Sequence, residues 1–443
     1  TNMYHHPYVS YLKSEKIIFA IANIQFRFGH ISFLQYVQAL LTNDLFNLIS
    51  LASINIIFYI CFIYFVSSKV FKTKYLNFNF LIIVLFGSFV LIKFARYREY
   101  GNDLIPLLVC IYFLIQIFDL NKNKYFSKTE IINLSLPFFA FMFAHKISFT
   151  FSFLMFLPLF TNKIIDLIKQ FKLSYIFAFA LILFPWLLKN LLTTSCLVYP
   201  IEFTCISNSI FELQGLAQPS KASWLTEIWA KGFIDHPNWR ELNLNEYASG
   251  FNWVATWLDG HFIKIIEITS PLFLIIFMFT FYLLINREKF LVKNTNQNIE
   301  ILYWSVWITI IIGLSIWFYK APIFRYGSFY IISFIILSYI LIFNYFFKLK
   351  KSKNLIFFKI IFIISLSFCV LKNFVRINKS DLELFPKTVE TENIIIFQNA
   401  KIKDFKLLRV KDGLCYYTKF TCSHEIPENI KIKKFKNYYI LTE

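Results

Sequence analysis

The sequence predicts an all-α polytopic membrane protein with about ten transmembrane helices, an extracytoplasmic helical loop and a small mixed C-terminal tail. Of its 443 residues, 57% are hydrophobic, 21% are aromatic and only 16% are charged. A soluble domain carries about 25% charged residues and cannot cover its surface with so few polar groups. Long apolar runs recur along the chain, and most lysines cluster between them.

Apolar runs of roughly 18–20 residues cross a bilayer as helices. We expect ten such segments. The fourth and fifth are short and meet at Ala144-His145-Lys146, so they form either two half-length spans or one broken hairpin. The ten ranges are 45–68, 77–93, 104–119, 132–145, 147–161, 173–193, 263–286, 301–318, 327–346 and 355–372.

Basic residues alternate between the two sides of this predicted bundle. Five loops on one side hold 16 Lys or Arg, in clusters near 69–74, 122–128, 163–172, 287–293 and 348–353. The short loops on the other side hold five, namely Arg96, Arg98, Lys146, Lys320 and Arg325. The positive-inside rule makes the lysine-rich loops cytoplasmic. The net charge of +19 therefore reflects membrane orientation, and we expect no nucleic-acid partner.

Three regions follow from this topology. Residues 1–44 form an extracytoplasmic segment with an interfacial helix, and residues 45–372 form the transmembrane domain. That domain includes an extracytoplasmic loop, 194–262, which holds five of the nine tryptophans and predicts short helices along the membrane surface. Residues 373–443 form an extracytoplasmic tail domain. Because the chain opens at Thr1 with no targeting segment, we expect it to be a fragment that lacks its start.

The seven cysteines fit the same topology. Cys61, Cys110 and Cys369 fall inside predicted spans, where cysteine serves as a small apolar side chain. The other four form two close pairs in extracytoplasmic segments, where an oxidising compartment favours disulfides. We therefore expect Cys196–Cys205 and Cys415–Cys422 disulfides; the alternative is four free thiols. No cysteine or histidine spacing indicates a metal site.

Arginine usage indicates a phosphate site. Only 8 of the 45 basic residues are Arg, yet Arg27, Arg96, Arg98 and Arg325 lie in outward segments close to the membrane. The planar guanidinium grips phosphate at two points, as the phosphate of a lipid carrier requires. The alternative is contact with lipid headgroups, or structural pairing with carboxylates such as Glu99.

Lys146, Asp103 and four histidines complete the candidate site. A lysine between two short apolar stretches is expensive unless it is functional or paired, although it can also snorkel to the interface. Asp103 opens the third span, either as a partner for these cations or as a helix N-cap. Histidines are weaker candidates: His145 adjoins Lys146, and for His5, His6 and His30 the alternative is a solvated loop.

Several short motifs resemble the C-type membrane glycosyltransferases. The segment Tyr100-Gly101-Asn102-Asp103-Leu104 resembles the acidic residue that opens a later span in that superfamily, and Ala144-His145-Lys146 resembles its basic apex between two short spans. Pro185-Trp186 through Lys189-Asn190, leading to Tyr199-Pro200, is similar to another of its segments. Arg27-Phe28-Gly29-His30 and Ala321 to Gly327 look like an uncharacterised bacterial family of polytopic membrane proteins of this type.

The resemblance implies transfer of a sugar from a polyprenyl-phosphate donor to an envelope glycan, lipid or protein acceptor on the extracytoplasmic side of a bacterial inner membrane. In it, Arg27, Lys146 and Arg325, with Arg96 and Arg98, would bind the donor phosphate, and Asp103 would orient the acceptor or a cation. The superfamily's catalytic aspartate has no counterpart here and is expected before Thr1. The cofactor is unknown; a divalent cation is compatible with the site, but the sequence requires none. A transporter or flippase, or a polymerase of lipid-linked polysaccharide, is the alternative function.

Overall fold

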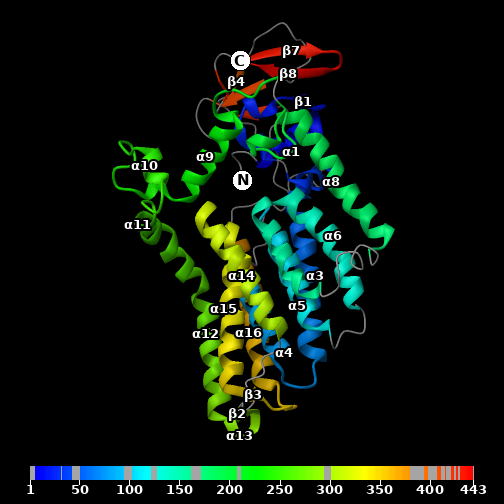
Figure 1. Cartoon of the computed structure of the whole chain (residues 1–443), viewed down its shortest axis with the longest axis vertical. Coiled ribbons are helices and arrows are strands. Elements are labelled where there is room, and N and C mark those ends of the chain that lie inside the picture. The colour runs from blue at the N-terminus through cyan, green and yellow to red at the C-terminus, as the bar shows by residue number, and fades with distance from the viewer. Residues whose placement is uncertain are drawn as a thin grey trace.

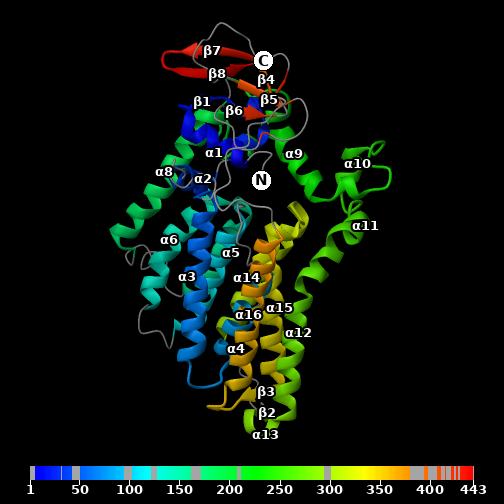
Figure 2. The same cartoon turned by 180° about the vertical axis from the view of Figure 1, so that it is seen from behind.

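The computed structural model describes most of the chain as a tall helical bundle with a small mixed domain at one end (Figure 1). The described ranges are 5–30, 32–41, 50–93, 102–120, 127–160, 171–206, 211–293, 301–379, 394–397, 407–410, 415, 421–423, 426–427 and 430–442. Figure 2 shows the same arrangement from behind. We call the end that carries the two three-stranded sheets the domain end, and the opposite end, where β2 (Leu291–Lys293) pairs with β3 (Phe347–Leu349), the ribbon end.

Six described helical segments are long and apolar enough to cross a membrane, by length and composition. The predicted class, a helical membrane protein, is therefore confirmed, but the prediction of about ten spans is wrong. One of the six is the continuous run Val254–Ile285, made of α11 (Val254–Trp257), the π-helical turn η9 (Leu258–Phe262) and α12 (Ile263–Ile285). The other five are α3 (Ser50–Lys72), α8 (Leu173–Thr194), α14 (Ile301–Lys320), α15 (Phe324–Phe346) and α16 (Ile356–Asn378).

The remaining predicted spans are shorter or less apolar. The helices α4 (Phe78–Lys93) and α5 (Leu104–Phe118) have 16 and 15 residues and are almost wholly buried among their neighbours. The helix α6 (Lys128–His145) carries polar residues through its first half. An apolar run shows only that a helix avoids water, and it does not distinguish lipid from protein surroundings. This is why the sequence overcounted the spans.

The segment that follows Lys146 has an unusual geometry. η5 (Ile147–Leu159) is a 3₁₀-helix of 13 residues, whereas most such helices have three or four. Its rise of about 2.0 Å per residue makes it about 26 Å long. A segment that looks too short to cross a bilayer as an α-helix thus reaches almost as far as the longer helices beside it.

Glycines allow α14 and α15 to pack closely. A Cβ at Gly313 of α14 would lie 2.4 Å from the Tyr330 ring, and a Cβ at Gly327 of α15 would lie 2.4 Å from the Trp317 ring. Each helix therefore offers a glycine to an aromatic ring of the other. Small residues at membrane helix interfaces let backbones approach in this way.

A buried polar network holds four helices together toward the ribbon end. Lys69 Nζ donates to Asp119 Oδ2 at 2.7 Å, and Asn79 Nδ2 donates to the Phe118 carbonyl at 2.6 Å. The Tyr303 hydroxyl donates to Asn79 Oδ1, and its ring stacks on Phe118 at 4.6 Å. The network joins α3, α4 and α14 to the end of α5.

The ribbon end joins loops that the charge pattern placed on one side. The strand β2 (Leu291–Lys293), which follows α13 (Arg287–Phe290), pairs antiparallel with β3 (Phe347–Leu349). The Leu76 backbone N–H also donates to the Ser352 carbonyl at 2.9 Å. These three lysine-rich loops therefore lie together, as the predicted alternation requires.

The opposite end carries a sheet domain built from the beginning, the middle and the end of the chain. Its N-terminal part also includes the helices α1 and α2. In the sequence, α2 lies within residues 1–44, where an interfacial helix was expected. The order of one sheet is β1-β8-β7 and that of the other is β4-β5-β6. The elements are α1 (His5–Ser14), β1 (Ile18–Phe19), η1 (Ile21–Asn23), η2 (Phe26–Gly29), α2 (Phe33–Leu41), β4 (Ile394–Phe397), β5 (Leu407–Val410), β6 (Thr421–Ser423), β7 (Lys431–Phe435) and β8 (Tyr438–Thr442).

Asn23 connects these three parts of the sheet domain. Its amide nitrogen donates to the Glu212 and Leu441 carbonyls at 3.1 and 3.0 Å, and its Oδ1 accepts from the Gln214 N–H at 2.9 Å. The side chain is buried. One amide thus satisfies backbone groups of two segments that are far from it in sequence.

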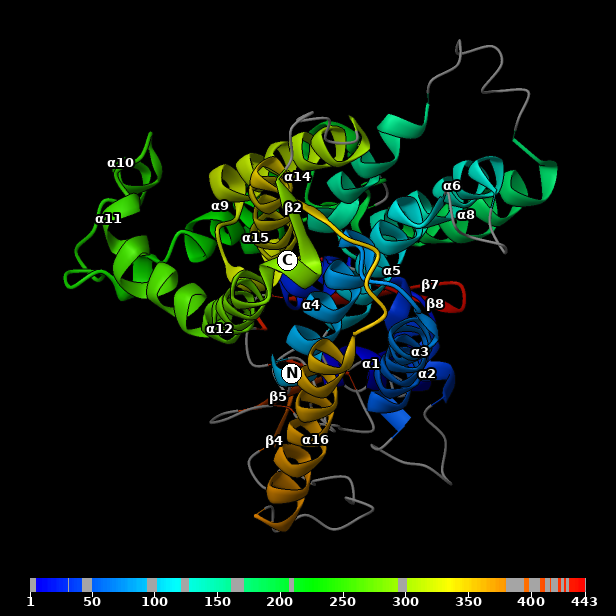
Figure 3. The same ribbon diagram turned by 90° about the horizontal axis from the view of Figure 1, so that it is seen from below.

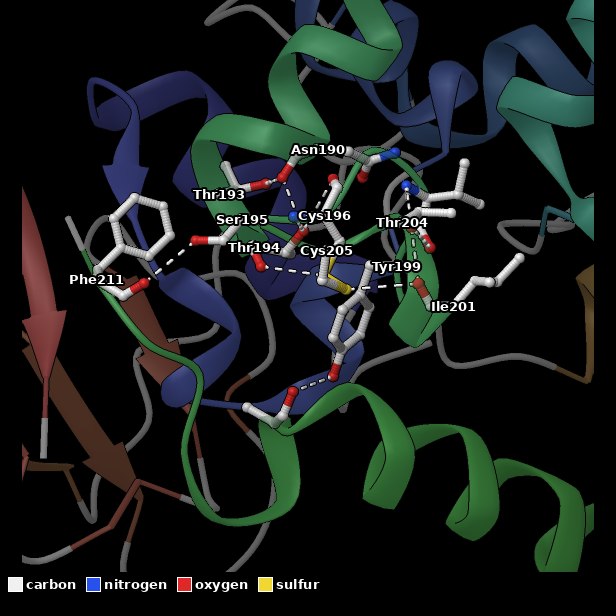
Figure 4. Close-up of a disulfide and its surroundings, with 12 residues drawn as sticks. Asn190, Thr193, Thr194, Ser195, Cys196, Tyr199, Ile201, Thr204, Cys205 and Phe211 are labelled. Atoms are coloured by element: carbon white, nitrogen blue, oxygen red, sulfur yellow. Dashed lines mark hydrogen bonds between the residues drawn. A yellow bond between two sulfur atoms is a disulfide. The ribbon is translucent and has the colours of Figure 1, made fainter. Parts of the chain in front are cut away.

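Both expected disulfides are present. Cys196–Cys205 closes a turn after α8, shown in Figure 4, where the Tyr199 hydroxyl donates to the Ala217 carbonyl at 2.9 Å. Cys415–Cys422 lies in the tail. The three cysteines predicted inside spans are free thiols.

An arm of short helices runs from the sheet domain to the start of α12. It includes α9 (Pro219–Ala230), η8 (Phe233–Asp235) and α10 (Leu244–Ala248), and Figure 3 shows it extending to one side of the bundle. Two contacts hold it to the end of α14 and the turn that follows: Lys320 lies 3.6 Å from Glu227, and Trp257 Nε1 donates to the Pro322 carbonyl at 2.5 Å.

The close approach of α14 and α15 predicts the effect of a larger residue at Gly313. Gly313→Leu forces the side chain into the Tyr330 ring, and we expect a loss of about 1–3 kcal/mol, because overpacking strains its neighbours. Thermal unfolding in detergent measures the change. The neighbouring exposed residue gives the control, Ile312→Leu, which should melt like the wild type. Equal melting temperatures for both variants would contradict the proposed packing constraint.

Candidate functional site

Three of the charged residues singled out in the sequence come together at the domain end of the bundle. Asp103 occupies the N-cap position of α5, Lys146 joins α6 to η5, and Arg325 lies in the first turn of α15. With Tyr326 they form a group that we call the Lys146 cluster. Each member stands at the end of a helix because the bundle interior between the ends is apolar.

Asp103 and Lys146 form an ion pair. The side chain of Lys146 is 17% exposed and that of Asp103 is 31% exposed. An aspartate at an N-cap usually accepts hydrogen bonds from the first turn of its own helix. The Asp103 side chain makes no such bond. Its carboxylate instead pairs with a lysine from another segment, so the N-cap alternative does not explain its orientation.

Tyr326 brings the two cations together. Lys146 Nζ lies 4.4 Å from the centre of its ring and the Arg325 guanidinium carbon lies 4.9 Å from it. Arg325 Nη2 also donates to the Tyr326 hydroxyl at 3.2 Å. An aromatic face attracts cations through its quadrupole and holds them without neutralising them.

The charge of Lys146 depends on a balance between opposing neighbours. Burial, and secondly the Arg325 guanidinium, lower the pKa of the Lys146 ammonium well below its usual value. The Asp103 carboxylate opposes both effects by favouring the charged form. The protonation state of Lys146 therefore depends on the Asp103 carboxylate beside it.

His145, next to Lys146, links this cluster to the N-terminal segment. Its Nδ1 lies 2.7 Å from Ser32 Oγ and its Nε2 lies 2.9 Å from the Asn102 carbonyl oxygen. The Ser32 N–H donates to Gln35 Oε1 at 3.1 Å, and Gln35 Nε2 donates to His5 Nδ1 at 3.3 Å. Two of the four histidines predicted for the site therefore belong to one hydrogen-bonded chain.

The other predicted residues are placed differently. The Arg27 guanidinium lies 5.2 Å from the Phe26 ring, and the His30 ring contacts Tyr199 edge-on at 5.3 Å, both within the sheet domain. His6 belongs to α1, and its side chain is outside what the structure describes, as are Arg96 and Arg98. Within the described part of the chain, no group of His, Cys, Asp or Glu is arranged to hold a metal ion.

One comparison with known proteins identifies the family. A family model described as a domain of unknown function (DUF8201) matches residues 1–332. The chain belongs to this family. No curated protein and no solved structure matches the chain. The matched DUF8201 region contains the whole Lys146 cluster and ends inside α15, before α16 and the tail.

Sequence reasoning missed two residues of this DUF8201 site. Tyr326 directly follows Arg325 in the segment Ala321 to Gly327, but nothing in the sequence showed that its ring contacts both cations. Ser32 carried no signal, because a serine before a helix is ordinarily a cap. Both roles arise from tertiary contacts.

The ion pair predicts a measurable coupling. Asp103→Asn removes the charge that compensates Lys146, and Lys146→Met removes the cation, so each change should destabilise the protein. The double variant should recover part of the loss. We expect a coupling of about 1–2 kcal/mol, between the values for surface and buried pairs. Thermal unfolding of all four proteins in detergent completes the cycle. Strictly additive losses would show that the two side chains do not interact.

Proposed function

We propose that this chain is a membrane glycosyltransferase-like protein that uses a polyprenyl-phosphate-linked sugar on the extracytoplasmic side of a bacterial inner membrane. The acceptor would be an envelope glycan, lipid or protein. One observation carries the proposal: Lys146 and Arg325, from separate segments, both contact Tyr326, and Asp103 of a third segment pairs with Lys146.

The composition of the Lys146 cluster suits a lipid phosphate. Arg325 is exposed, whereas Lys146 is mostly buried, so the cluster has one cation open to its surroundings and one enclosed by the protein. A phosphate that arrives from the exposed side would meet the guanidinium fork first and the ammonium next. Charge-assisted hydrogen bonds of this kind are about twice as strong as neutral ones.

The chemistry of sugar transfer assigns a role to each group. Lys146 and Arg325 would stabilise the negative charge that grows on the departing phosphate. A carboxylate must deprotonate the acceptor hydroxyl. In the proposal Asp103 is not this base; it keeps Lys146 charged and orients the acceptor or a divalent cation.

A transporter or flippase is the second candidate, and the distribution of charge argues against it. A transport path needs polar or charged groups through the depth of the bundle. In the membrane-crossing helices that the structure describes, most charged side chains lie within about two turns of a helix end; Lys264 and Glu267, the eleventh and fourteenth residues of the run Val254–Ile285, lie deeper. The same distribution favours a reaction site at the domain end. A polymerase of lipid-linked polysaccharide would also use such a site.

Binding of a short-chain polyprenyl phosphate tests the proposal. Native mass spectrometry of the protein in nanodiscs that contain excess phosphatidylglycerol separates specific binding from general headgroup contact. We expect Arg325→Ala to weaken binding about tenfold or more, which corresponds to about 1.4 kcal/mol. Arg325→Lys should also be weak, because lysine keeps the charge and loses the fork.

The matched control for this measurement is Lys320→Ala. Lys320 is a second cation at the end of α14, close in sequence to Arg325, but it is 63% exposed and pairs with Glu227 of the arm. Its removal should leave binding unchanged. Equal binding by the wild type and Arg325→Ala, or no preference over phosphatidylglycerol, would refute a lipid-phosphate site.

The orientation is tested separately by thiol labelling of intact cells. Lys221→Cys places an exposed thiol on the arm, and Lys289→Cys places one at the ribbon end. A membrane-impermeant maleimide should label the arm cysteine at once and the ribbon cysteine only after permeabilisation. The reverse order of labelling would place the Lys146 cluster on the cytoplasmic side.

A further inference from the structure

His145 is held from three directions. Ser32 Oγ lies 2.7 Å from Nδ1, the Asn102 carbonyl oxygen lies 2.9 Å from Nε2, and the Phe141 ring stacks on the imidazole at 5.4 Å. The residue is 5% exposed. A ring with a partner on each nitrogen and another on its face has little freedom to rotate.

The partners also determine the tautomer of His145. The Asn102 carbonyl only accepts hydrogen bonds, so Nε2 must carry the hydrogen and donate it. His145 ends α6, outside the six candidate spans, and burial lowers its pKa to about 4, so the ring is neutral at pH 7. Nδ1 is then an acceptor, and the Ser32 hydroxyl donates to it.

These two bonds act on the two halves of the ion pair. Asn102 immediately precedes Asp103, so the hydrogen bond from Nε2 fixes the peptide plane from which the Asp103 side chain departs. Lys146 immediately follows His145 in the chain. Because Asp103 makes no hydrogen bond to the first turn of α5, its own helix does not fix its carboxylate. His145 therefore supplies the connection that helix capping would otherwise provide.

Ser32 extends this connection to the N-terminal segment. Its N–H donates to Gln35 Oε1, as in the reciprocal bonds of a capping box, while its hydroxyl is directed at His145. Ser32 and Asp103 each stand directly before a helix, and each sends its side chain across to the α6–η5 junction. Through these hydrogen bonds, the position of α2 affects the positions of Asp103 and Lys146.

We propose that His145 is a positioning residue, which holds Asp103 against Lys146 through the Asn102 carbonyl and sets that geometry from the docked N-terminal segment. As a statement about function, this inference rests on the proposed lipid-phosphate site. As a statement about geometry, it does not need the ligand, and it is tested without one.

Amine labelling of Lys146 measures the geometry. A paired and mostly buried ammonium reacts slowly with an amine-directed reagent, so mass spectrometry after brief labelling reports whether Asp103 still holds it. His145→Phe keeps the ring stacking and removes both hydrogen bonds, and we expect Lys146 to react several-fold faster. His145→Gln places an amide nitrogen near the Nε2 position and should restore slow labelling. His145→Asn reaches only the Nδ1 position and should not.

Lys231 provides the internal control. It is 2% exposed, it pairs with Glu227 at 2.6 Å, and it lies in the arm, away from His145 in the fold. Its labelling should stay slow in every folded variant, whereas general unfolding would expose both lysines. If His145→Phe unfolds, Ser32→Ala takes its place, because it removes only the Nδ1 partner and should give a smaller increase at Lys146.

The outcomes separate the inference from the proposed function. Unchanged Lys146 labelling in His145→Phe, with Lys231 still protected, overturns the positioning role, as does equal labelling of the Gln and Phe variants. The second measurement is polyprenyl-phosphate binding by the wild type and by the His145 and Ser32 variants. If the wild type fails to bind while the labelling order holds, the proposed function fails and the positioning role of His145 stands.

Discussion

The structure depends on the exclusion of charge from the middle of the bundle. An unpaired charge in an apolar interior costs several kcal/mol, and most charged side chains of the described bundle lie toward the helix ends. At each end they must find partners from other helices. Lys69 and Asp119 do so toward the ribbon end, and Asp103 and Lys146 do so at the domain end. The same constraint that stabilises the bundle therefore assembles its candidate site.

The class of the protein was predictable because apolar runs and lysine clusters are local features of the sequence. The number of spans was not, since α4 and α5 are apolar for a different reason: they lie inside the bundle and contact protein rather than lipid. Nor did the sequence indicate that 13 residues would adopt a 3₁₀-helix, because such helices are usually only three or four residues long. The disulfides were predictable because each pair is close in sequence.

The candidate site was also predictable only in part, because some of its features are local in sequence and others depend on tertiary packing. Asp103, Lys146 and Arg325 stood out because each is a charge at the end of an apolar run, facing the same side. Their convergence is tertiary, and it brings both cations into contact with the Tyr326 ring, a role that no local pattern indicates. Arg27 shared the same signal, but its described contact lies within the sheet domain. The sequence thus identified charged residues at the ends of apolar runs as candidates, and the packing of the helices determined which of these residues meet.

The sheet domain has a consequence for how the protein is made. β1 begins at residue 18 and its partner β8 begins at residue 438, and Asn23 donates to the Leu441 carbonyl, 418 residues away. A ribosome that synthesises the chain from its N-terminus produces every membrane-crossing helix before it produces β8. The first strand must therefore wait, with its hydrogen-bonding edge unpaired, until the last strand has been translated and has reached the same side of the membrane. Contacts so distant in sequence form late. Interrupted synthesis would leave a bundle that is complete in the bilayer but lacks the central strand of the β1-β8-β7 sheet.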